Sequence, residues 1–527
     1  MTVTPQALSR TVQDFLSEAS GAIVLENGAI AFDLAQSKYS ISGEHNRCLL
    51  HLWSPERNSV RRVLEAEVRN GTLRLAVQRM GQARPSKLEI CRERDRRSPS
   101  TRRLCRAAYE RTLRGVLERR FPEFKLVKLT SGVDLEKSFG PVYVRGIVRR
   151  GRSAFAFLGV NGQETQSSID AALTFGILWL EVCRQSQAAN VLVEGLQLFV
   201  PAGTSGLVRE RMANLNRHAA KWALFELDER HDDLVEIDCS DRGNVSTRLV
   251  HAFDDLAARQ RFSDSIATVQ KVLPNCEVSV VSAAEVVFRW RGLAFARARL
   301  SCIPGQFRSA EEIVFGVGAE ERILETRNES AFSKLATCLR DTRHPYGPRH
   351  DPLWRLRPER WLESLVAGDV SVLDDRLDPT CQYSQIPAFS AADRAMIDVL
   401  TATPAGRLAV VELKADEDIH LPLQGLDYWA RVQWHQARGE FLRFGYFEGR
   451  ELSDETPLLF LVAPALHVHP STDILLRYLS PEIEWQFIGI DERWREGVRV
   501  VFRKRAESRK ITAVSDEPSD FQLPVAT

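Results

Sequence analysis

MIDVLTATPAGRLAVVELKADEDIHLPLQGLDY, residues 396–428, is the stretch that decides how the C-terminal part of the chain folds. Two apolar runs are joined by TPAG, in which Pro404 and Gly406 favour a turn. The two runs therefore predict a β-hairpin with strands at 395–402 and 408–414. The residues that follow have helical spacing and predict a helix over 421–437.

Five polar side chains in this stretch are predicted to converge. Asp398 and Glu412 are nearly symmetric about the turn, so strand pairing should bring them together. Glu412 and Lys414 are two apart and share a face of the strand. Gln424 and Tyr428 are four apart and share a face of the helix. Two carboxylates with a backbone carbonyl suit Mg²⁺ or Mn²⁺ rather than zinc, so we expect a metal site that hydrolyses a phosphodiester.

This constellation resembles the PD-(D/E)XK nuclease superfamily, and within it the RecB-like and NucS-like branches that carry a QxxxY helix. The matching segments are MIDVL, VVELKA and QGLDY, and the resemblance spans residues 357–505. By resemblance, Asp398 and Glu412 would be metal ligands and Lys414 the catalytic lysine. Gln424 and Tyr428 would complete the catalytic site.

Some members of the superfamily add an acidic ligand on the preceding helix. Glu363, in ERWLESL, is the expected further metal ligand, with Glu359 as the alternative. One departure is Ile397, which stands where the motif has proline, and many RecB-like members share it. The resemblance implies a Mg²⁺- or Mn²⁺-dependent nuclease, expected to be a DNA endonuclease in DNA repair or defence, with RNA as the alternative substrate.

Two other interpretations of the same residues stay open. Glu412 and Lys414 are also what an ordinary edge-strand ion pair would look like, with Asp398 bonded to backbone. Alternatively, a nuclease-like fold would serve only to bind nucleic acid or another protein, without catalysis. The histidines His467 and His469 alternate near a strand end, which is more typical of strand-edge residues than of a metal site with no third ligand.

The segment HPYGPRHDP (344–352) is predicted to be a linker because its prolines and glycine interrupt regular structure. The pattern after it is helix, three strands, helix, strand, helix, strand, and residues 101–230 have the same order. A Gly-Arg turn precedes the third strand in both, at Gly151 and at Gly406. Aligning these turns predicts a duplicated fold, with Phe157 and Gly159 where the second copy has Glu412 and Lys414.

We therefore expect a multidomain α/β protein with a restriction-endonuclease-like αβββαβ core at its C-terminal end. The expected divisions are a mostly-β region (1–100), a degenerate nuclease-like domain (101–230), a mixed α/β connecting domain (231–345), the nuclease-like domain (346–505) and a disordered tail (506–527). Within the connecting part, a long amphipathic helix is predicted over 247–271.

The most basic stretch is 84–120, which holds thirteen Lys and Arg residues against five Asp and Glu. Its second half has helical spacing. Such a helix is either a solvated face or a phosphate-contacting surface. A cluster of Trp53 with Arg57, Arg61 and Arg62 is a second candidate for contact with nucleic acid, against an ordinary packed tryptophan.

The composition agrees with an ordinary globular chain of 527 residues, with 44% hydrophobic and 27% charged residues. A formal charge of +1 excludes a globally basic nucleic-acid coat, so any such surface is a local patch. The nine cysteines form no CxxC pair, and no signal sequence or transmembrane run is recognisable. We expect a reduced, cytoplasmic protein that binds DNA and no membrane.

Overall fold

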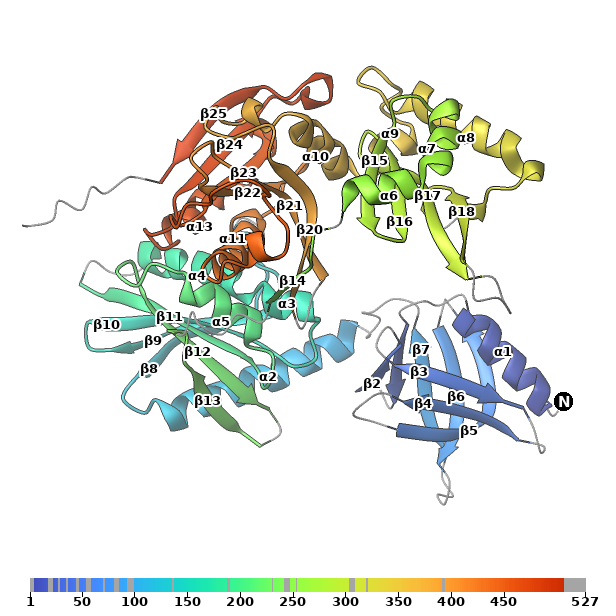
Figure 1. Ribbon diagram of the computed structural model, residues 1–527. Coiled ribbons are helices and arrows are strands. Elements are labelled where there is room, and N and C mark those ends of the chain that lie inside the picture. Colours follow the sequence, from blue (N-terminus) through green and yellow to red (C-terminus); the bar gives the residue numbers. More distant parts are fainter. Residues whose placement is uncertain are drawn as a thin grey trace, which may run out of the picture.

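The protein is a multidomain α/β protein whose elements form four separate sheets in the computed structural model (Figure 1). The structure describes residues 4–506, with gaps at 18–21, 27–28, 35–36, 44–46, 54–57, 70–71, 80–84, 92–98, 135–136, 187–189, 230, 241–246, 253, 303–308, 319–320 and 391–393. The expected disordered tail lies outside the described residues, except for Ala506. Among the described residues, no helix combines the length and the apolar character needed to cross a membrane.

The N-terminal domain is one helix on a seven-stranded antiparallel sheet of order β2-β1-β7-β6-β5-β4-β3. Its strands alternate between buried and half-buried residues, as in β4, so one face of the sheet forms the core. The elements are α1 (Pro5–Ser17), β1 (Ile23–Glu26), β2 (Ala29–Asp33), β3 (Lys38–Ser42), β4 (Cys48–Trp53), β5 (Asn58–Arg69), β6 (Thr72–Arg79) and β7 (Ser86–Cys91).

The first α/β domain follows, with a six-stranded mixed sheet of order β13-β12-β11-β10-β9-β8. Only β10, β11 and β12 are parallel to one another. Its elements are α2 (Pro99–Arg120), β8 (Lys125–Thr130), β9 (Tyr143–Arg150), β10 (Ser153–Val160), α3 (Gln166–Asp170), α4 (Ala172–Ser186), β11 (Leu192–Pro201), α5 (Gly206–Ala213), β12 (Lys221–Asp228) and β13 (Asp233–Ile237).

The second α/β domain has the same strand order, β20-β21-β22-β23-β24-β25, and the same parallel and antiparallel pairs. One further strand, β14, pairs with β20 and makes this sheet seven-stranded. The elements are α9 (Pro352–Arg355), α10 (Pro358–Gly368), η2 (Val370–Val372), β20 (Gln382–Ser390), β21 (Arg394–Ala402), β22 (Leu408–Leu413), α11 (Leu421–Gln436), α12 (Glu440–Arg443), β23 (Leu458–Pro464), η3 (Ala465–His467), α13 (Thr472–Arg477), β24 (Trp485–Ile490), η4 (Trp494–Glu496) and β25 (Val500–Arg505).

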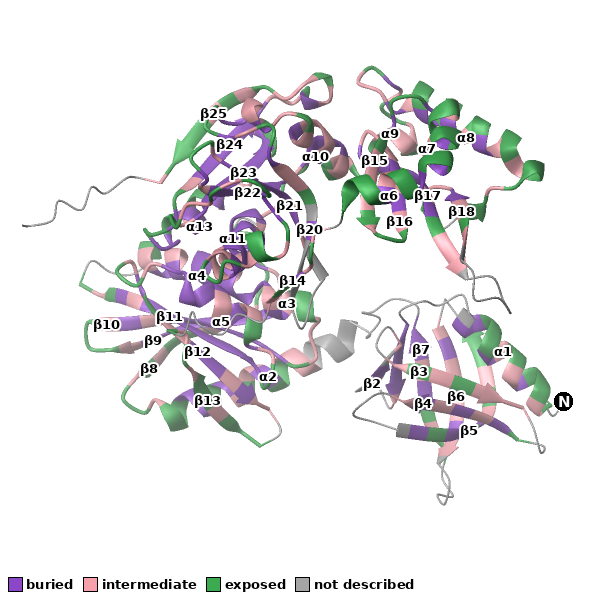
Figure 2. Cartoon of the chain, in the orientation of Figure 1, coloured by how far each residue is buried: buried purple, intermediate pink, exposed green. Residues whose placement is uncertain are grey.

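Burial explains why the central strands of both α/β domains read as continuous apolar runs. Every residue of β22 and β23 is buried, because helices cover both faces of the sheet (Figure 2). In the second domain, α10 packs on one face and α11 on the other. In the first domain, α2 and α4 take these positions. The two domains are therefore three-layered α/β structures with the same architecture.

The connecting domain has a five-stranded antiparallel sheet, β15-β16-β17-β18-β19, covered by helices. Its elements are α6 (Asp255–Arg261), α7 (Ser263–Val272), β15 (Glu277–Ser282), β16 (Glu285–Trp290), β17 (Leu293–Cys302), β18 (Ser309–Phe315), β19 (Arg322–Ile323), η1 (Thr326–Asn328) and α8 (Glu329–Thr342). The strand β13 lies wholly beyond the expected boundary at 230 but belongs to the sheet of the first α/β domain. The strand β14 (Thr247–Leu249) precedes this domain in the chain but joins the sheet of the second α/β domain.

The long helix predicted over 247–271 is wrong. Residues 247–249 form β14, and helix begins only after Asp254, whose side chain accepts a hydrogen bond from Ala257 N and so caps α6. A break at Phe262, which is fully buried, then separates α6 from α7. The pairing of residues 247–249 with β20 could not be predicted from the apolar spacing of this segment, because it depends on a strand far along the chain.

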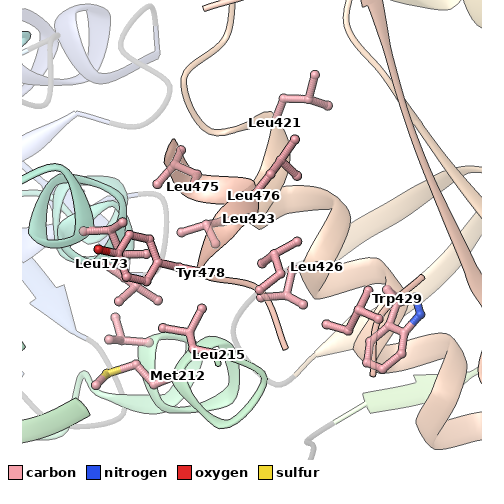
Figure 3. Packing of buried hydrophobic residues seen from close by; sticks show 14 of the residues in the cluster. Leu173, Met212, Leu215, Leu421, Leu423, Leu426, Trp429, Leu475, Leu476 and Tyr478 are labelled. Carbon is pink, nitrogen blue, oxygen red and sulfur yellow. The ribbon is translucent and has the colours of Figure 1, made fainter. Parts of the chain in front are cut away.

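The two α/β domains face each other through α4 and α5 of the first and α11 and α13 of the second. The contact is reciprocal, since α4 meets α13 and α5 meets α11. The segments after α5 and α13 form an antiparallel bridge at Leu215 and Leu479, with backbone bonds of 2.8 and 2.9 Å on either side. Leucines from both domains pack around it (Figure 3). Two copies of one fold therefore share a single core.

Candidate active site

The candidate site lies where the pairing of β21 with β22 ends. The ladder runs from Ala402–Leu408 to Val399–Val411. One residue further, the carboxylate of Asp398 takes the place of a strand partner, and its Oδ2 accepts a hydrogen bond from Leu413 N at 3.1 Å. The strand β22 meanwhile continues beside β23, where Lys414 N donates to Val462 O at 2.9 Å. The strands thus separate at the level of Asp398.

Glu412 and Lys414 project from β22 into this opening. Lys414 Nζ donates to Glu412 Oε1 at 3.0 Å. The Glu412 side chain is only 2% exposed, and its Oε2 accepts no hydrogen bond from a donor among the described residues. Its carboxyl is close enough to that of Asp398 for the two to share a proton. The predicted ion pair therefore exists, but in the interior rather than on an edge strand, because β22 is the fourth of seven strands. The edge-strand part of that interpretation is wrong, whereas its other part, Asp398 bonded to backbone, is confirmed by the bond from Leu413 N.

The helix α11, which carries Gln424 and Tyr428, packs on β22. Gly425 lets the helix approach the sheet, because a Cβ there would lie 3.7 Å from the Cβ of Glu412 and 2.4 Å from a methyl of Leu461. Burial, and then the charges of Glu412 and Asp398, raise the pKa of Tyr428. Its hydroxyl therefore lies within electrostatic reach of both carboxyls. The Oε1 of Gln424 is buried and has no partner among the described residues.

The acidic residues predicted on the preceding helix lie on α10. Glu363 is buried, and its Oε2 forms an ion pair with Arg360 at 2.7 Å. Burial, together with the charge of Asp398, raises the pKa of Glu363 to about 7 despite the opposing charge of Arg360. Glu359 is half-exposed, with its Oε1 4.0 Å from Lys414 Nζ. Both carboxyls interact electrostatically with the site. Glu363 interacts with Asp398, and Glu359 interacts with Lys414.

The electrostatics of the site are those of carboxyls crowded together out of water. Burial raises the pKa of Glu412 well above its usual range, and the charge of Asp398 raises it further. Burial also raises the pKa of Asp398. Lys414 loses basicity through burial, but Glu412 and Glu359 more than restore it and leave its pKa raised. Within the site, Lys414 alone does not offset the burial of these acids.

The donor set fits a hard divalent cation. Asp398 and Glu412 supply carboxylate oxygens, and the unpartnered Oε2 of Glu412 is the kind of buried atom that such an ion would satisfy. Among the described residues, no three His, Cys, Asp or Glu side chains are grouped closely enough to hold a metal by themselves. Mg²⁺ commonly takes one or two carboxylates and completes its shell with water and substrate phosphate, so two protein ligands suffice for it.

The two histidines of the next loop lie apart from this point. His467 is 3.9 Å from Asp416 and 3.8 Å from Glu492, and His469 is 3.8 Å from Glu417. These are ion-pair distances in a partly exposed rim. They agree with surface residues at the end of β23 rather than with a second metal centre.

The first α/β domain has no counterpart of this acidic site among its described residues, but the residues there differ from those expected. Phe157 faces α2, in the core of the opposite layer. The residue that faces α4, as Glu412 faces α11, is Leu158, and it pairs with Leu198 as Glu412 pairs with Leu461. The alignment on the Gly-Arg turn is therefore wrong by one residue. The turn of the second hairpin is longer, and a shift of one residue reverses the face of every side chain.

With this register, an arginine stands in the place of the first carboxylate. Leu158 pairs with Arg145, and Val160 takes the position of Lys414. The guanidinium of Arg145 is buried and lies over the rings of Phe139 and Trp179, 4.6 and 5.4 Å from their centroids. Aliphatic and aromatic groups therefore fill the space where the second domain gathers its carboxyls, and the charged groups beside them are cations, since Lys128 Nζ also lies 5.2 Å from the centre of the Trp179 ring.

The sequence signal for this correspondence lies in the helices and in the strands after them. Gly176 of α4 packs on Leu196 and Leu198 as Gly425 packs on Leu459 and Leu461. Phe175 and Trp179 then take the positions of Gln424 and Tyr428. The strands read LQLFVP (196–201) and LFLVAP (459–464) and match without a gap. These short matches give the correct register, and the turns do not.

The expected phosphate-contacting surfaces are partly neutralised. On α2, Arg106 pairs with Glu164 at 3.2 Å, and Arg119 and Arg120 pair with Asp232 and Asp233. In the N-terminal domain, Arg61 is buried and donates to Glu26 at 2.9 and 3.1 Å, so it is a structural residue. Arg57 and residues 92–98 of the basic stretch lie outside the described residues.

No family model matches the chain, and no curated protein matches its sequence. The resemblance to nucleases therefore depends on the residues and geometry given above.

Proposed function

We propose that the second α/β domain is a restriction-endonuclease-like nuclease of the PD-(D/E)XK type that hydrolyses phosphodiester bonds of DNA. One observation carries this proposal. Asp398, Glu412 and Lys414 meet at the point where β21 and β22 separate, and the Glu412 carboxylate is buried there with one oxygen unpartnered. A merely structural carboxylate in such a place would cost stability and bring nothing.

Asp398 and Glu412 would hold Mg²⁺ or Mn²⁺, with Glu363 available nearby on α10. When bound, the ion would supply Lewis-acid polarisation of the phosphate and lower the pKa of a water. Glu363 is held by Arg360 through one oxygen, so the proposal assigns Asp398 and Glu412 as the principal ligands. The charge of the ion would also offset the repulsion between these buried carboxyls.

The other residues of the site have roles that follow from their positions. Lys414 stays protonated because Glu412 and Glu359 raise its pKa, so it acts as a fixed positive charge beside the reacting phosphate. The charges of Glu412 and Asp398 act on the hydroxyl of Tyr428, and Gln424 lies one helical turn before Tyr428 on α11 with a buried Oε1, so both residues would orient Lys414 and the phosphate, as the resemblance implies. The raised pKa of Tyr428 keeps its hydroxyl as a hydrogen-bond donor at neutral pH.

The test is cleavage of plasmid and of linear duplex DNA by the full-length protein with Mg²⁺, with Mn²⁺ and with EDTA. We expect metal-dependent cleavage that is lost in Lys414→Ala and in Glu412→Ala. Lys504→Ala is a matched control, because this exposed lysine of the same domain pairs only with Asp473 among the described residues. No cleavage by the wild-type protein of DNA or of RNA would refute the enzyme. DNA binding without cleavage would instead support a non-catalytic nuclease-like fold.

A further inference from the structure

A cluster of arginines surrounds Trp361 on α10, at the contact between the connecting domain and the second α/β domain. The guanidinium carbons of Arg291, Arg343 and Arg495 lie 5.5, 4.8 and 5.3 Å from the centre of the indole ring. Trp361 itself is fully buried. Arg291 comes from the connecting domain and Arg495 from η4 of the second α/β domain. Below, the name arginine cluster covers Arg291, Arg495 and Trp361. Arg343 is left out because its hydrogen bonds are satisfied by backbone carbonyls.

The turn that carries Arg291 is built to sit against α10. Arg291 and Gly292 both have positive φ, 49° and 73°, in the two-residue turn between β16 and β17. A Cβ on Gly292 would lie 1.9 Å from the carbonyl oxygen of Arg360, so only glycine permits this approach. The position of Arg291 beside α10 is therefore a consequence of the local backbone.

Arg343 is the structural member of the group. Its side chain is completely buried and donates to the carbonyls of Trp290, Arg291, Leu353 and Leu356 at 2.7 to 3.2 Å. These bonds hold the connecting domain on the segment that leads into α10. Arg343 therefore needs no further partner, and it adds a fixed positive charge beside the arginine cluster.

The arginine cluster, in contrast, has unsatisfied groups of one kind. The Nε of Arg291, the Nε of Arg495 and the Nε1 of Trp361 are all buried and have no hydrogen-bond partner among the described residues. All three are donors. The guanidinium of Arg495 stacks on Trp354 and Trp494, 4.0 and 4.1 Å from their ring centres. Neither arginine forms a hydrogen bond or a close ion pair with another described residue, although Glu277 acts on Arg291 and Asp416 on Arg495 over longer distances. Three buried donors with no acceptor point to a missing acceptor.

Repulsion between the positive charges of these arginines also favours a bound anion. Burial lowers the pKa of Arg495 to about 10. Burial also lowers the pKa of Arg343 to about 10, with further lowering by the positive charges of Arg495 and Arg291. A water molecule would satisfy the donors but would leave this repulsion in place. An oxyanion satisfies both, and the planar guanidinium group suits phosphate oxygens in particular.

We propose that Arg291, Arg495 and Trp361 Nε1 form an oxyanion site that holds a phosphodiester group of the nucleic acid strand. The identity of the strand depends on the function proposed above. Trp361 lies between Glu359 and Glu363 in the sequence of α10, but residues two apart on a helix point to different sides, so the oxyanion site and the candidate active site lie on different sides of this helix. The connecting domain thereby contributes directly to substrate binding, and Arg291 and Arg495 bind a phosphate away from the bond that is cut.

The first experiment measures binding of a fluorescent DNA duplex over a series of salt concentrations. It uses the Lys414→Ala background, in which no cleavage is expected. We expect Arg291→Gln with Arg495→Gln to weaken binding about tenfold or more, and to lower the slope of log affinity against log salt by about one for each phosphate that the variant no longer binds. Arg327→Gln is the matched control, because this arginine of the connecting domain is 84% exposed and should leave both values unchanged.

The second experiment separates an oxyanion site from a purely structural cluster. Inorganic phosphate at millimolar concentration should raise the thermal unfolding midpoint of the wild-type protein and should not raise that of the double variant. Arg495→Gln alone serves the same purpose if the double variant does not fold. No phosphate effect together with unchanged DNA affinity would overturn the proposal. A phosphate effect with unchanged DNA affinity would assign the site to a small free anion and overturn its assignment to the strand.

These outcomes are distinguishable from failure of the proposed function. If the wild-type protein cleaves neither DNA nor RNA but binds DNA in a manner that depends on Arg291 and Arg495, the nuclease is refuted and the oxyanion site stands. If it cleaves DNA and the double variant binds as tightly as its Lys414→Ala parent, the nuclease stands and this site is refuted.

Discussion

The two α/β domains of this protein share the order and direction of six strands, the main helices on both faces and a reciprocal interface, but they differ at the site where β21 separates from β22 in the second domain. The second domain places Asp398 and Glu412 there, and the first places Arg145 and Leu158. The comparison teaches that the architecture does not require the acidic residues. They are an addition to a fold that is complete without them.

The buried acidic residues also lower the stability of the fold. Glu412 is buried with an unpartnered oxygen and a pKa well above its usual range, whereas Leu158 packs in an apolar core. Residues that disagree with their surroundings in this way mark functional sites. If the comparison is correct, the two positions should respond in opposite ways to substitution.

The largest expected effect separates activity from stability. Glu412→Gln should lower DNA cleavage about 100-fold or more, because it removes a metal ligand, while thermal stability stays equal or rises. Leu158→Ala should instead lower stability by about 2–5 kcal/mol, because it leaves a cavity. Cleavage assays and denaturant unfolding test both. A Glu412→Gln variant that is less stable and fully active would reverse the comparison.

The next effect concerns the ion pair that crosses the interface between the two α/β domains. Arg211 of α5 donates to both oxygens of Asp427 on α11, at 2.9 and 2.8 Å, and both side chains are nearly buried. Arg211→Ala should cost about 3–5 kcal/mol because the Asp427 charge is left unpaired. Restoring part of this loss with Asp427→Asn in the same chain would show coupling across the interface. Strictly additive effects would argue against it.

A smaller effect should be equal in the two domains. Gly176→Ala and Gly425→Ala each place a methyl group against two leucines of the underlying strand. We expect about 1–3 kcal/mol of destabilisation for each, since the leucine side chains must move. Thermal unfolding of the two variants provides the measurement. Markedly unequal losses would mean that the helices do not correspond.

The smallest effect is on the pH dependence of stability. Without a divalent ion, Glu363 has a pKa of about 7 and that of Glu412 is also raised, whereas unfolded glutamates titrate near 4.3. Between these values the folded state retains protons that the unfolded state has lost, so stability falls as pH rises from about 4 to 7. The unfolding midpoint of Glu412→Gln should fall less over this interval. Parallel profiles for the two proteins would contradict the buried charge.

Much of the second α/β domain was predictable from the sequence, because its hairpin and helix have strong local patterns. Asp398, Glu412 and Lys414 do meet, as strand pairing about the turn predicts. The position of Glu363 against Arg360 and the 4.0 Å contact of Glu359 with Lys414 were not predictable. Those distances depend on how α10 packs on the sheet, and no local pattern records that packing.

The wrong register in the first domain and the wrong helix over 247–271 have one physical origin. Turns and short segments vary in length, whereas the positions of residues at a packed helix–sheet contact stay fixed. The Gly-Arg turns suggested Phe157 for the position that Leu158 occupies. The apolar spacing after Thr247 suggested a helix where a short strand pairs with β20. Aligning the helical glycines Gly176 and Gly425 first would have given the correct register, because a glycine at a close helix-sheet contact cannot shift by one residue.

The reciprocal bridge at Leu215 and Leu479 has a consequence for assembly. Two separate subunits with such an interface would come apart on dilution. Here both partners belong to one polypeptide, and the tether keeps their effective concentration high however dilute the protein is. The tether also frees each copy from symmetry, since a substitution in one is not repeated in the other. Identical subunits lack that freedom, and it is what allows one half to do without the carboxylates of the site while its neighbour keeps them.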